Sequence, residues 1–304
     1  MSALVGERSV LACGTEGYPA ALACVVQPPK LLYVVGDPSA LEEGIAIVGA
    51  RRATPYGRGC AKRFAGIAAK RDVVVISGGA RGCDAAAHIA ALDAGGRTVA
   101  FLGGGCDRLY PAEHEGLFQR IVDGGGAVVS EHAWDEDPKP YRFRLRNRLI
   151  AGLARATLIV EAGLPSGTFS TADEALAANR DVLVVPGAIT AASSRGANRL
   201  LYQGAMPVVD DETFGDALFS LFGCLKQAEA PAGGRSWPGT SGLSNAVVDA
   251  LRAEPLGMEQ LYAIAAESCG GVDARSWLME RLVEAELAGA IARHPDGRWG
   301  PAAR

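Results

Sequence analysis

Short apolar runs alternate with segments of helical apolar spacing along most of the chain. The runs are rich in β-branched residues and lie at 45–49, 73–76, 98–102, 127–130, 157–160 and 182–185. Segments with apolar residues three or four positions apart follow at 58–70, 83–94, 112–122, 145–154 and 169–179. Continuous apolar strands alternating with helices indicate a mostly parallel sheet with helices on both faces. The pattern therefore predicts an α/β domain over residues 45–225.

The loops that follow these strands hold the most unusual residues. In a parallel sheet, the loops leaving the carboxyl ends of the strands line up along one edge, and ligands bind there. The pattern places on this edge Arg51, Arg52, Ser77–Gly82, Gly103–Gly105, Ser166–Thr168 and a basic segment that begins at Lys139. Glycine loops that open helices offer backbone N–H groups to phosphate, although glycine also serves tight turns. Several such loops on one edge predict a binding site for an anionic ligand.

The basic arm, residues 139–155, combines cations with aromatic rings. Its first ten residues contain no acid and carry Lys139, Arg142, Arg144, Arg146 and Arg148, with Tyr141 and Phe143 between them. Pro138 and Pro140 favour an extended entry, and helical spacing begins at Leu145. Cations neutralise phosphates and aromatic faces stack on unpaired bases. The alternative is a solvated basic loop whose aromatic rings enter the core.

Segments outside residues 45–225 have a different character. Residues 1–44 are predicted to be a short lead-in that packs on the main domain, and 226–242 a linker rich in Pro, Gly, Ser and Ala. Residues 243–304 show three helical segments and a hairpin that turns at Pro295–Gly297, an order that resembles a winged helix. Because this part is acidic, with seven carboxylates from Glu254 to Glu286, we expect it to contact protein rather than DNA.

Composition narrows the class of protein. The 304 residues are 49% apolar with a net charge of −4, so the chain can bury a core and any basic patch is local. Seven scattered cysteines without a C-x-x-C pair predict reduced thiols in a cytoplasmic protein. No apolar run could span a bilayer and no signal peptide is recognisable, so we expect no membrane insertion.

Candidate catalytic groups are sparse. The glycine loops match neither the dinucleotide-binding nor the Walker A pattern. Asp84 and His88 share a helix face, but a structural acid with a hydrogen-bonded histidine is the favoured interpretation. Glu131 and Glu161 follow strands and are expected to cap loops. Asp173 and Glu174, after Ser166–Thr168, leave open a nucleotide or nucleoside-phosphate hydrolase.

Several blocks of the sequence resemble the DNA processing protein A (DprA/Smf) family. The blocks include IAIVGARRATPYG, SGGARGCDAAAH, FLGGGCDRLYP, FRLRNRLIAGLARATLIVEA and SGTFSTADEAL, and the resemblance covers about residues 18–215. It implies an extended Rossmann-like domain that binds single-stranded DNA without sequence preference, forms homodimers and loads RecA recombinase during natural transformation. The family's G-S-R motif falls on Gly49–Arg51, with Ala50 in place of serine, and its stacking phenylalanine falls on Phe143.

These arguments predict a DNA-binding protein with no catalytic residue, metal or cofactor. Apolar residues near 214–222, including Phe214 and Leu218, are candidates for the dimer surface. A regulatory protein that works through its acidic tail is a further alternative. The residues expected at the DNA are Arg51, Arg52, Gly78, Gly79, Arg81, Lys139, Arg142, Phe143, Arg146, Asn147, Arg148, Ser166, Gly167 and Thr168.

Overall fold

The chain divides into two compact units, Met1–Lys226 and Gln227–Arg304. The structure, a computed structural model, describes residues 4–164, 166–224, 243–253, 256–268, 274–294 and 297–301. The predicted linker at 226–242 and the tip of the predicted hairpin at Pro295–Asp296 lie outside these residues. No helix in the described ranges has both the length and the apolar character needed to cross a membrane.

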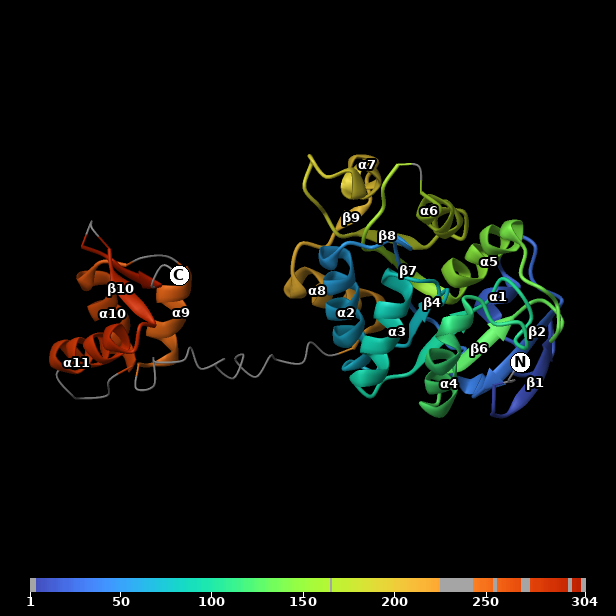
Figure 1. Cartoon of the computed structure of the whole chain (residues 1–304), viewed down its shortest axis with the longest axis horizontal. Helices are drawn as coiled ribbons and strands as arrows, with labels where there is room; N and C mark the ends of the chain where they lie inside the picture. Colours follow the sequence, from blue (N-terminus) through green and yellow to red (C-terminus); the bar gives the residue numbers. More distant parts are fainter. Residues whose placement is uncertain are drawn as a thin grey trace. The chain divides into compact units, whose positions relative to one another are not determined.

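The larger unit is a nine-stranded sheet flanked by helices (Figure 1). Its strands are β1 (Arg8–Ala12), β2 (Leu31–Gly36), β3 (Gly44–Val48), β4 (Val75–Ser77), β5 (Thr98–Phe101), β6 (Ala127–Ser130), β7 (Ala154–Ile159), β8 (Asp181–Val184) and β9 (Met206–Pro207). Its α-helices are α1 (Ala20–Ala23), α2 (Pro55–Ala69), α3 (Cys83–Asp93), α4 (Glu115–Asp123), α5 (Pro140–Leu153), α6 (Thr168–Ala177), α7 (Arg195–Tyr202) and α8 (Asp211–Phe222). The predicted strand–helix alternation is confirmed.

The order of the strands locates a switch point in the sheet. The order is β1-β2-β6-β5-β4-β3-β7-β8-β9, and every pair from β6 to β9 is parallel. The chain winds outward from β3 through β4, β5 and β6 and then returns to β7 on the other side of β3. In such sheets the crevice outside the carboxyl ends of the two strands at the reversal is the usual ligand position. That position here lies beyond Val48 and Ile159.

Each face of the sheet carries its own apolar core. Along β3, Ala46 and Val48 belong to the core shared with α5, α6 and α7, while Ile45 and Ile47 belong to the core shared with α2, α3 and α8. This alternation follows from the two-residue side-chain period of a strand. Helices on both faces, as the sequence predicts, leave only the loop edges of the sheet open to a ligand.

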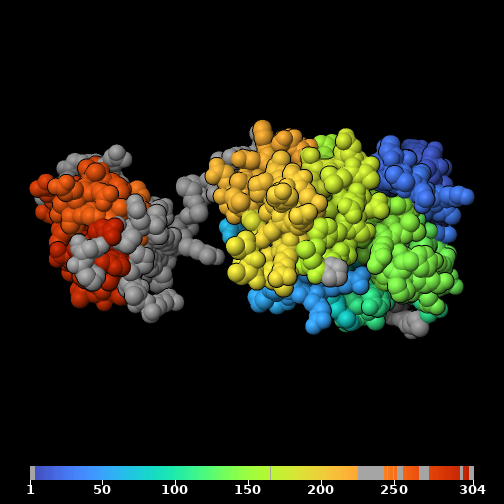
Figure 2. Space-filling view, turned by 90° about the horizontal axis from the view of Figure 1, so that it is seen from above, coloured from blue at the N-terminus to red at the C-terminus, as the bar shows by residue number. Residues whose placement is uncertain are grey.

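Residues 1–44 do more than pack on the main domain. β1 pairs with β2, and β2 pairs with β6, both antiparallel, so this segment extends the sheet. The segment and the β9–α8 region occupy opposite ends of the unit, visible as blue and as yellow to orange in Figure 2. The sequence predicted a lead-in that packs on the main domain but not this antiparallel pairing.

The basic arm begins its helix earlier than predicted. α5 starts at Pro140, where a proline is favoured because the first helical position needs no N–H donor. Lys139, the residue before that proline, is extended with φ −123° and ψ 145°. The expected extended arm up to Arg144 is therefore wrong, and its four arginines lie on a helix, whereas Lys139 precedes it.

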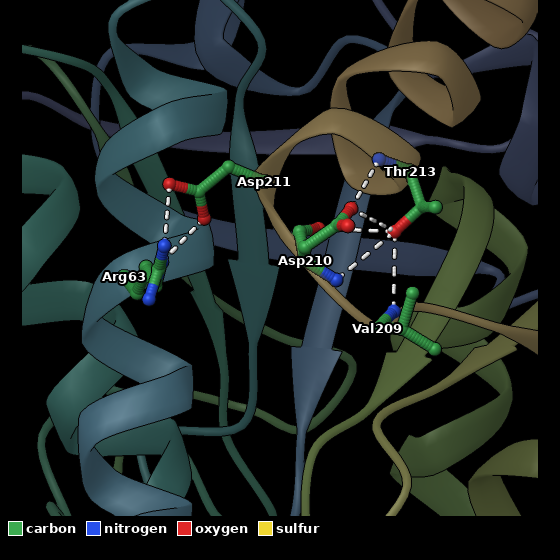
Figure 3. Close-up of polar contacts among 5 residues, drawn as sticks. All are labelled: Arg63, Val209, Asp210, Asp211 and Thr213. Atoms are coloured by element: carbon green, nitrogen blue, oxygen red, sulfur yellow. Dashed lines mark hydrogen bonds and ion pairs between the residues drawn. The ribbon is translucent and has the colours of Figure 1, made fainter. Parts of the chain in front are cut away.

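The last helix of the larger unit is held by a capping box and an ion pair (Figure 3). Thr213 N donates to Asp210 Oδ1 at 2.8 Å, and Asp210 N donates to Thr213 Oγ1 at 3.1 Å. Asp211 pairs with Arg63 of α2. Phe214 and Leu218 of α8 are fully buried in the core, so they are not available as the dimer contacts that the sequence suggested.

The smaller unit contains α9 (Asn245–Ala253), α10 (Met258–Ser268) and α11 (Ala274–Leu287), followed by β10 (Ile291–Arg293) and β11 (Trp299–Pro301). The two strands pair antiparallel, and Leu256 also bridges to Trp299. Leu251, Leu261, Leu278 and Leu282 form its core. The helices and strands follow the expected order, and their assignment as a winged helix stays a prediction.

Candidate nucleic-acid interface

A cavity opens at the switch point of the sheet. This first cavity has a volume of about 510 Å³. Its walls come from Val48–Arg52 at the end of β3, from Gly163 and Ser166–Thr168 after β7, from Ala80 and Asp84, and from α5. The sequence prediction that these loops share one edge is therefore confirmed for Arg51, Arg52 and Ser166–Thr168.

Three arginines at this cavity are unpaired. Arg51, Arg52 and Arg144 line it and are exposed to solvent. Among the residues that the structure describes, no carboxylate lies within ion-pair distance of any of the three. Most other exposed arginines of the larger unit have an acidic partner, as Arg81 has Glu113. A cluster of unpaired cations in a recess attracts anions.

Phe143 forms a wall between the first cavity and a second one. The second cavity, of about 240 Å³, is lined by Phe143 together with Gly78, Arg81 and Tyr110. The Tyr110 ring centroid lies 5.3 Å from that of Phe143, and Arg51 Cζ lies 5.4 Å from the Phe143 centroid. These contacts hold the half-buried ring at a place where it lines both cavities.

A close approach at Gly103 fixes the position of the same ring. A Cβ atom at Gly103 would lie 2.7 Å from Phe143 Cδ1, which no real pair of carbon atoms tolerates. The glycine in the loop after β5 therefore makes room for Phe143 rather than for phosphate.

One face of α5 lines the first cavity. Pro140, Phe143, Arg144, Asn147 and Ile150 all contribute to its wall, at the spacing of a single helical face. Asn147 Nδ2 also donates to Ser170 Oγ at 3.4 Å, which ties α5 to α6. Arg144 was not among the residues that we expected at the DNA. The three- and four-residue spacing would have included it if the helix had been started at Pro140.

Two of the expected contacts, Arg142 and Arg148, are used inside the protein. Arg148 is buried and pairs with both carboxylate oxygens of Glu131. Arg142 is 8% exposed, pairs with Glu136 and donates to Asp137 O at 3.0 Å. Neither residue lines either cavity. The structure thus corrects both: a desolvated, paired arginine secures the helix and is not offered to a ligand.

Arg146 is also buried but faces both cavities. Its Nη1 donates to Phe101 O at 2.7 Å, and its side chain is 3% exposed. Burial lowers the pKa of the guanidinium to about 10, and the carboxylate of Asp84 acts in the opposite direction. A Cβ atom at Gly78 would lie 1.9 Å from Nη1, so only glycine fits beneath this arginine.

The loop at residues 77–82 does not offer the donors that we expected. Gly78 N donates to Asp84 Oδ2 at 3.2 Å, and Ala80 N donates to the same oxygen at 3.3 Å. Gly79 is buried, and its carbonyl accepts a hydrogen bond from His114 Nδ1. Because an internal carboxylate already accepts the Gly78 N–H, the expectation that this group contacts DNA phosphate is corrected.

The N–H groups that open α6 are also bonded within the chain. Thr168 N donates to Ser166 Oγ at 3.1 Å, Phe169 N to Ser166 O at 3.4 Å and Ser170 N to Gly167 O at 3.2 Å. The loop Ser166–Thr168 lines the first cavity. What this loop offers the cavity is therefore the positive end of the α6 dipole.

Glu161 connects two of the walls, as expected for a carboxylate that caps a loop. Thr54 Oγ1 donates to Glu161 Oε2 at 2.5 Å, and Thr54 N donates to Oε1 at 3.2 Å. Thr54 also caps α2 through Gly57 N. The turn that carries Arg51 and Arg52 is thereby fastened to the end of β7.

The remaining candidate residues do not line the first cavity. Arg81 lines the second cavity but pairs with Glu113. Lys139 is exposed and lines neither cavity. Asp173 and Glu174, the carboxylates considered for a hydrolase, also stay outside both walls.

His88, the other group considered for acid–base chemistry, is fully buried. Its Nδ1 lies 2.7 Å from Thr98 Oγ1. Since the Thr98 hydroxyl donates to Val75 O, the histidine must be the donor between them. The favoured interpretation as a structural histidine agrees with this geometry.

Comparison with known proteins gives consistent matches. A family model described as DNA recombination-mediator protein A matches residues 9–218. The chain is 40% identical over 280 residues to a putative DNA processing protein DprA of Mycobacterium tuberculosis, covering 89% of this chain and 68% of the relative. It is 34% identical over 284 residues to protein Smf of Escherichia coli, covering 93% and 75%.

Two solved structures share the fold. DNA processing protein A of Streptococcus pneumoniae matches with a TM-score of 0.64 and 32% identity over 68% of this chain and 73% of that one. The protein of the same name from Helicobacter pylori matches with a TM-score of 0.65 and 31% identity, over 72% and 99%. The latter structure is described as giving insight into the single-stranded DNA binding mode of that protein.

Proposed function

Since this chain belongs to the DNA recombination-mediator protein A family, we propose that it binds single-stranded DNA and delivers it to RecA recombinase. The observation that carries the binding proposal is the cluster of Arg51, Arg52 and Arg144, exposed and unpaired, around the first cavity. Phosphates of a strand are the natural partners of such a cluster. The start of α6 adds the positive end of its helix dipole on another wall of the cavity.

Phe143 supports a preference for unpaired bases. Its ring borders both cavities, so a base can reach it only after leaving a duplex. Stacking on an aromatic ring tolerates every base, because each base has a π face. The proposed site therefore binds single strands without strong sequence preference and rejects duplex DNA.

We propose that binding involves no bond-breaking step. The buried carboxylate that lines the first cavity, Asp84, is committed to two backbone N–H groups. Asp173 and Glu174 lie outside the cavity walls. Incubation with 5′-AMP tests this directly: release of free base at catalytic rates would establish the hydrolase instead.

The proposal includes a homodimer, which would double the contacts along a long strand. Tyr202, Met206 and Val209 are all more than half exposed and lie on α7, on β9 and just after β9. Exposed apolar residues gathered on one edge mark surfaces for association. Light scattering of the free protein tests the dimer; the alanine variant of Met206 should weaken it.

RecA delivery and a cytoplasmic location are the remaining parts of the proposal. The family description as a recombination mediator supports the partner, and free cysteines support a reducing compartment. RecA delivery is tested by the rate of RecA filament nucleation on a protein-bound strand. An unchanged rate relative to naked DNA would reject it.

DNA binding itself is tested by fluorescence anisotropy of a labelled oligo-dT and of a duplex of equal length across a salt series. We expect the single strand to bind more tightly and its affinity to fall steeply with salt. Equal affinity for the two forms, or a flat salt dependence, would refute the site.

A further inference from the structure

The glycine loop between β4 and α3 already contains an anion. Gly78 N and Ala80 N both point at Asp84 Oδ2, at 3.2 and 3.3 Å. Convergent backbone N–H groups before a helix are the arrangement that holds phosphate in nucleotide-binding α/β proteins. Here the side chain of the second residue of α3 fills that position from within.

A buried cation faces the same position. Arg146 is 3% exposed and lines both cavities, and its Nε has no hydrogen-bond partner among the described residues. Burial raises the pKa of Asp84, and the charges of Arg146 and Arg51 act in the opposite direction. The floor of the site thus holds one acidic and one basic side chain. Among the described residues, its rim carries the unpaired charges of Arg51, Arg52 and Arg144.

We propose that Asp84 is a specificity determinant: its carboxylate occupies the phosphate position of the glycine loop and excludes inorganic phosphate and nucleoside monophosphates from the floor. This deepens the proposed DNA-binding function and rests on it. The phosphates of a strand stay at the rim, where the donors are free, and mononucleotides that the cell holds in excess do not compete. In a nucleotide-binding enzyme this glycine loop could hold the phosphate of a free nucleotide. Here Asp84 prevents that, and the site binds only a DNA strand.

Removing the carboxylate should open the position. In Asp84→Ala the N–H groups of Gly78 and Ala80 lose their acceptor, and Arg146 loses the carboxylate that acts on its pKa. We expect inorganic phosphate and 5′-AMP to bind this variant about tenfold or more tightly than wild type. Isothermal titration calorimetry with each probe measures this, and phosphate should also raise the melting temperature of the variant.

Two matched variants separate the proposal from a general loss of negative charge. Asp84→Asn keeps an oxygen in front of both N–H groups, so it should gain much less phosphate affinity than Asp84→Ala. Asp93→Ala removes an exposed acid from the other end of α3 and should behave as wild type. An Asp93→Ala gain as large as that of Asp84→Ala would overturn the proposal.

The other possible outcomes for Asp84→Ala also test the proposal. A folded Asp84→Ala variant that binds phosphate no better than wild type overturns the proposal. If Asp84→Ala is unfolded in phosphate-free buffer, millimolar phosphate should restore its circular dichroism, and failure to do so counts against the idea equally. Binding of oligo-dT to wild type is measured in parallel. If wild type does not bind oligo-dT, the DNA-binding function is rejected. A gain in phosphate affinity in Asp84→Ala would still show that Asp84 occupies the phosphate position.

Discussion

Arg148 donates to both carboxylate oxygens of Glu131, at 2.8 Å from Nη1 to Oε1 and 2.6 Å from Nη2 to Oε2. The two side chains are only 7% and 11% exposed. Removing one partner of a buried pair leaves the other charge desolvated. We expect Arg148→Ala to lower the free energy of unfolding by about 3–5 kcal/mol, measured by urea denaturation.

Arg144→Ala is the matched comparison on the same helix. Its side chain is exposed and unpaired, so stability should change by less than about 0.5 kcal/mol. Its affinity for oligo-dT should fall, because one phosphate contact is lost. If Arg148→Ala stays stable but binds DNA more weakly, Arg148 contacts DNA and is not the structural residue that we infer.

Replacing Phe143 should weaken single-strand binding without unfolding the protein. Phe143→Leu keeps an apolar side chain beside Gly103 but removes the stacking face. One stacked base contributes about 1–3 kcal/mol, so the dissociation constant for oligo-dT should rise by about 5- to 150-fold. Tyr141→Leu is the control, since Tyr141 is on the same helix, is exposed and lines neither cavity. Equal losses in the two variants would exclude Phe143 as the stacking residue.

Arg51→Ala should reduce the salt dependence of binding as well as the affinity. Each phosphate contact to a single strand contributes about 0.7 to the slope of log affinity against log salt. We expect the slope to become shallower by about that amount. Arg63→Ala serves as the control, because Arg63 pairs with Asp211 and lines neither cavity. A slope identical to wild type in Arg51→Ala would remove Arg51 from the interface.

His88 should make the fold sensitive to mild acid. Burial lowers the pKa of its imidazole from 6.5 to about 3. Between these values the unfolded chain binds more protons at this residue, so stability rises with pH and reaches its full value above about pH 6.5. The loss from about pH 6.5 to pH 5 is on the order of 2 kcal/mol.

Urea denaturation at several pH values tests the His88 prediction. His88→Gln should lower the overall stability but flatten its pH dependence over this interval. Thr98→Val breaks the hydrogen bond to the ring while leaving the titrating group, so it should keep the slope. The same pH slope in His88→Gln as in wild type would show that other groups cause it.

The location of the site could be predicted from sequence because it depends on topology. Arg51, Arg52 and Ser166–Thr168 follow apolar strands, and parallel strands bring such loops to one edge regardless of side-chain detail. Phe143 was predicted on the resemblance to the DNA processing protein A family. Its position between two cavities depends on Gly103 and Tyr110, which are distant in sequence, so no local sequence pattern could predict it.

The direction of each arginine could not be predicted. The arm carries five cations in ten residues, and which of them face inward depends on the partners that tertiary structure brings near. Glu131 lies just past β6 and pairs with Arg148, whereas Arg144, one helical turn earlier, has no acidic partner among the described residues. The start of α5 was readable from Pro140 at the first helical position, and placing it there would have brought Arg144 onto the face of Phe143.

The sheet ends at β9, a strand of only two residues whose second member, Pro207, has no N–H group. Such an edge offers too few backbone donors and acceptors for a second copy to continue the sheet. The dimer that we propose would therefore form at this edge by burying side chains such as Met206 and Val209, and apolar contacts depend little on ionic strength. Salt should then release the single strand from the proposed site and leave the proposed dimer intact, so the two properties can be measured separately in the wild-type protein.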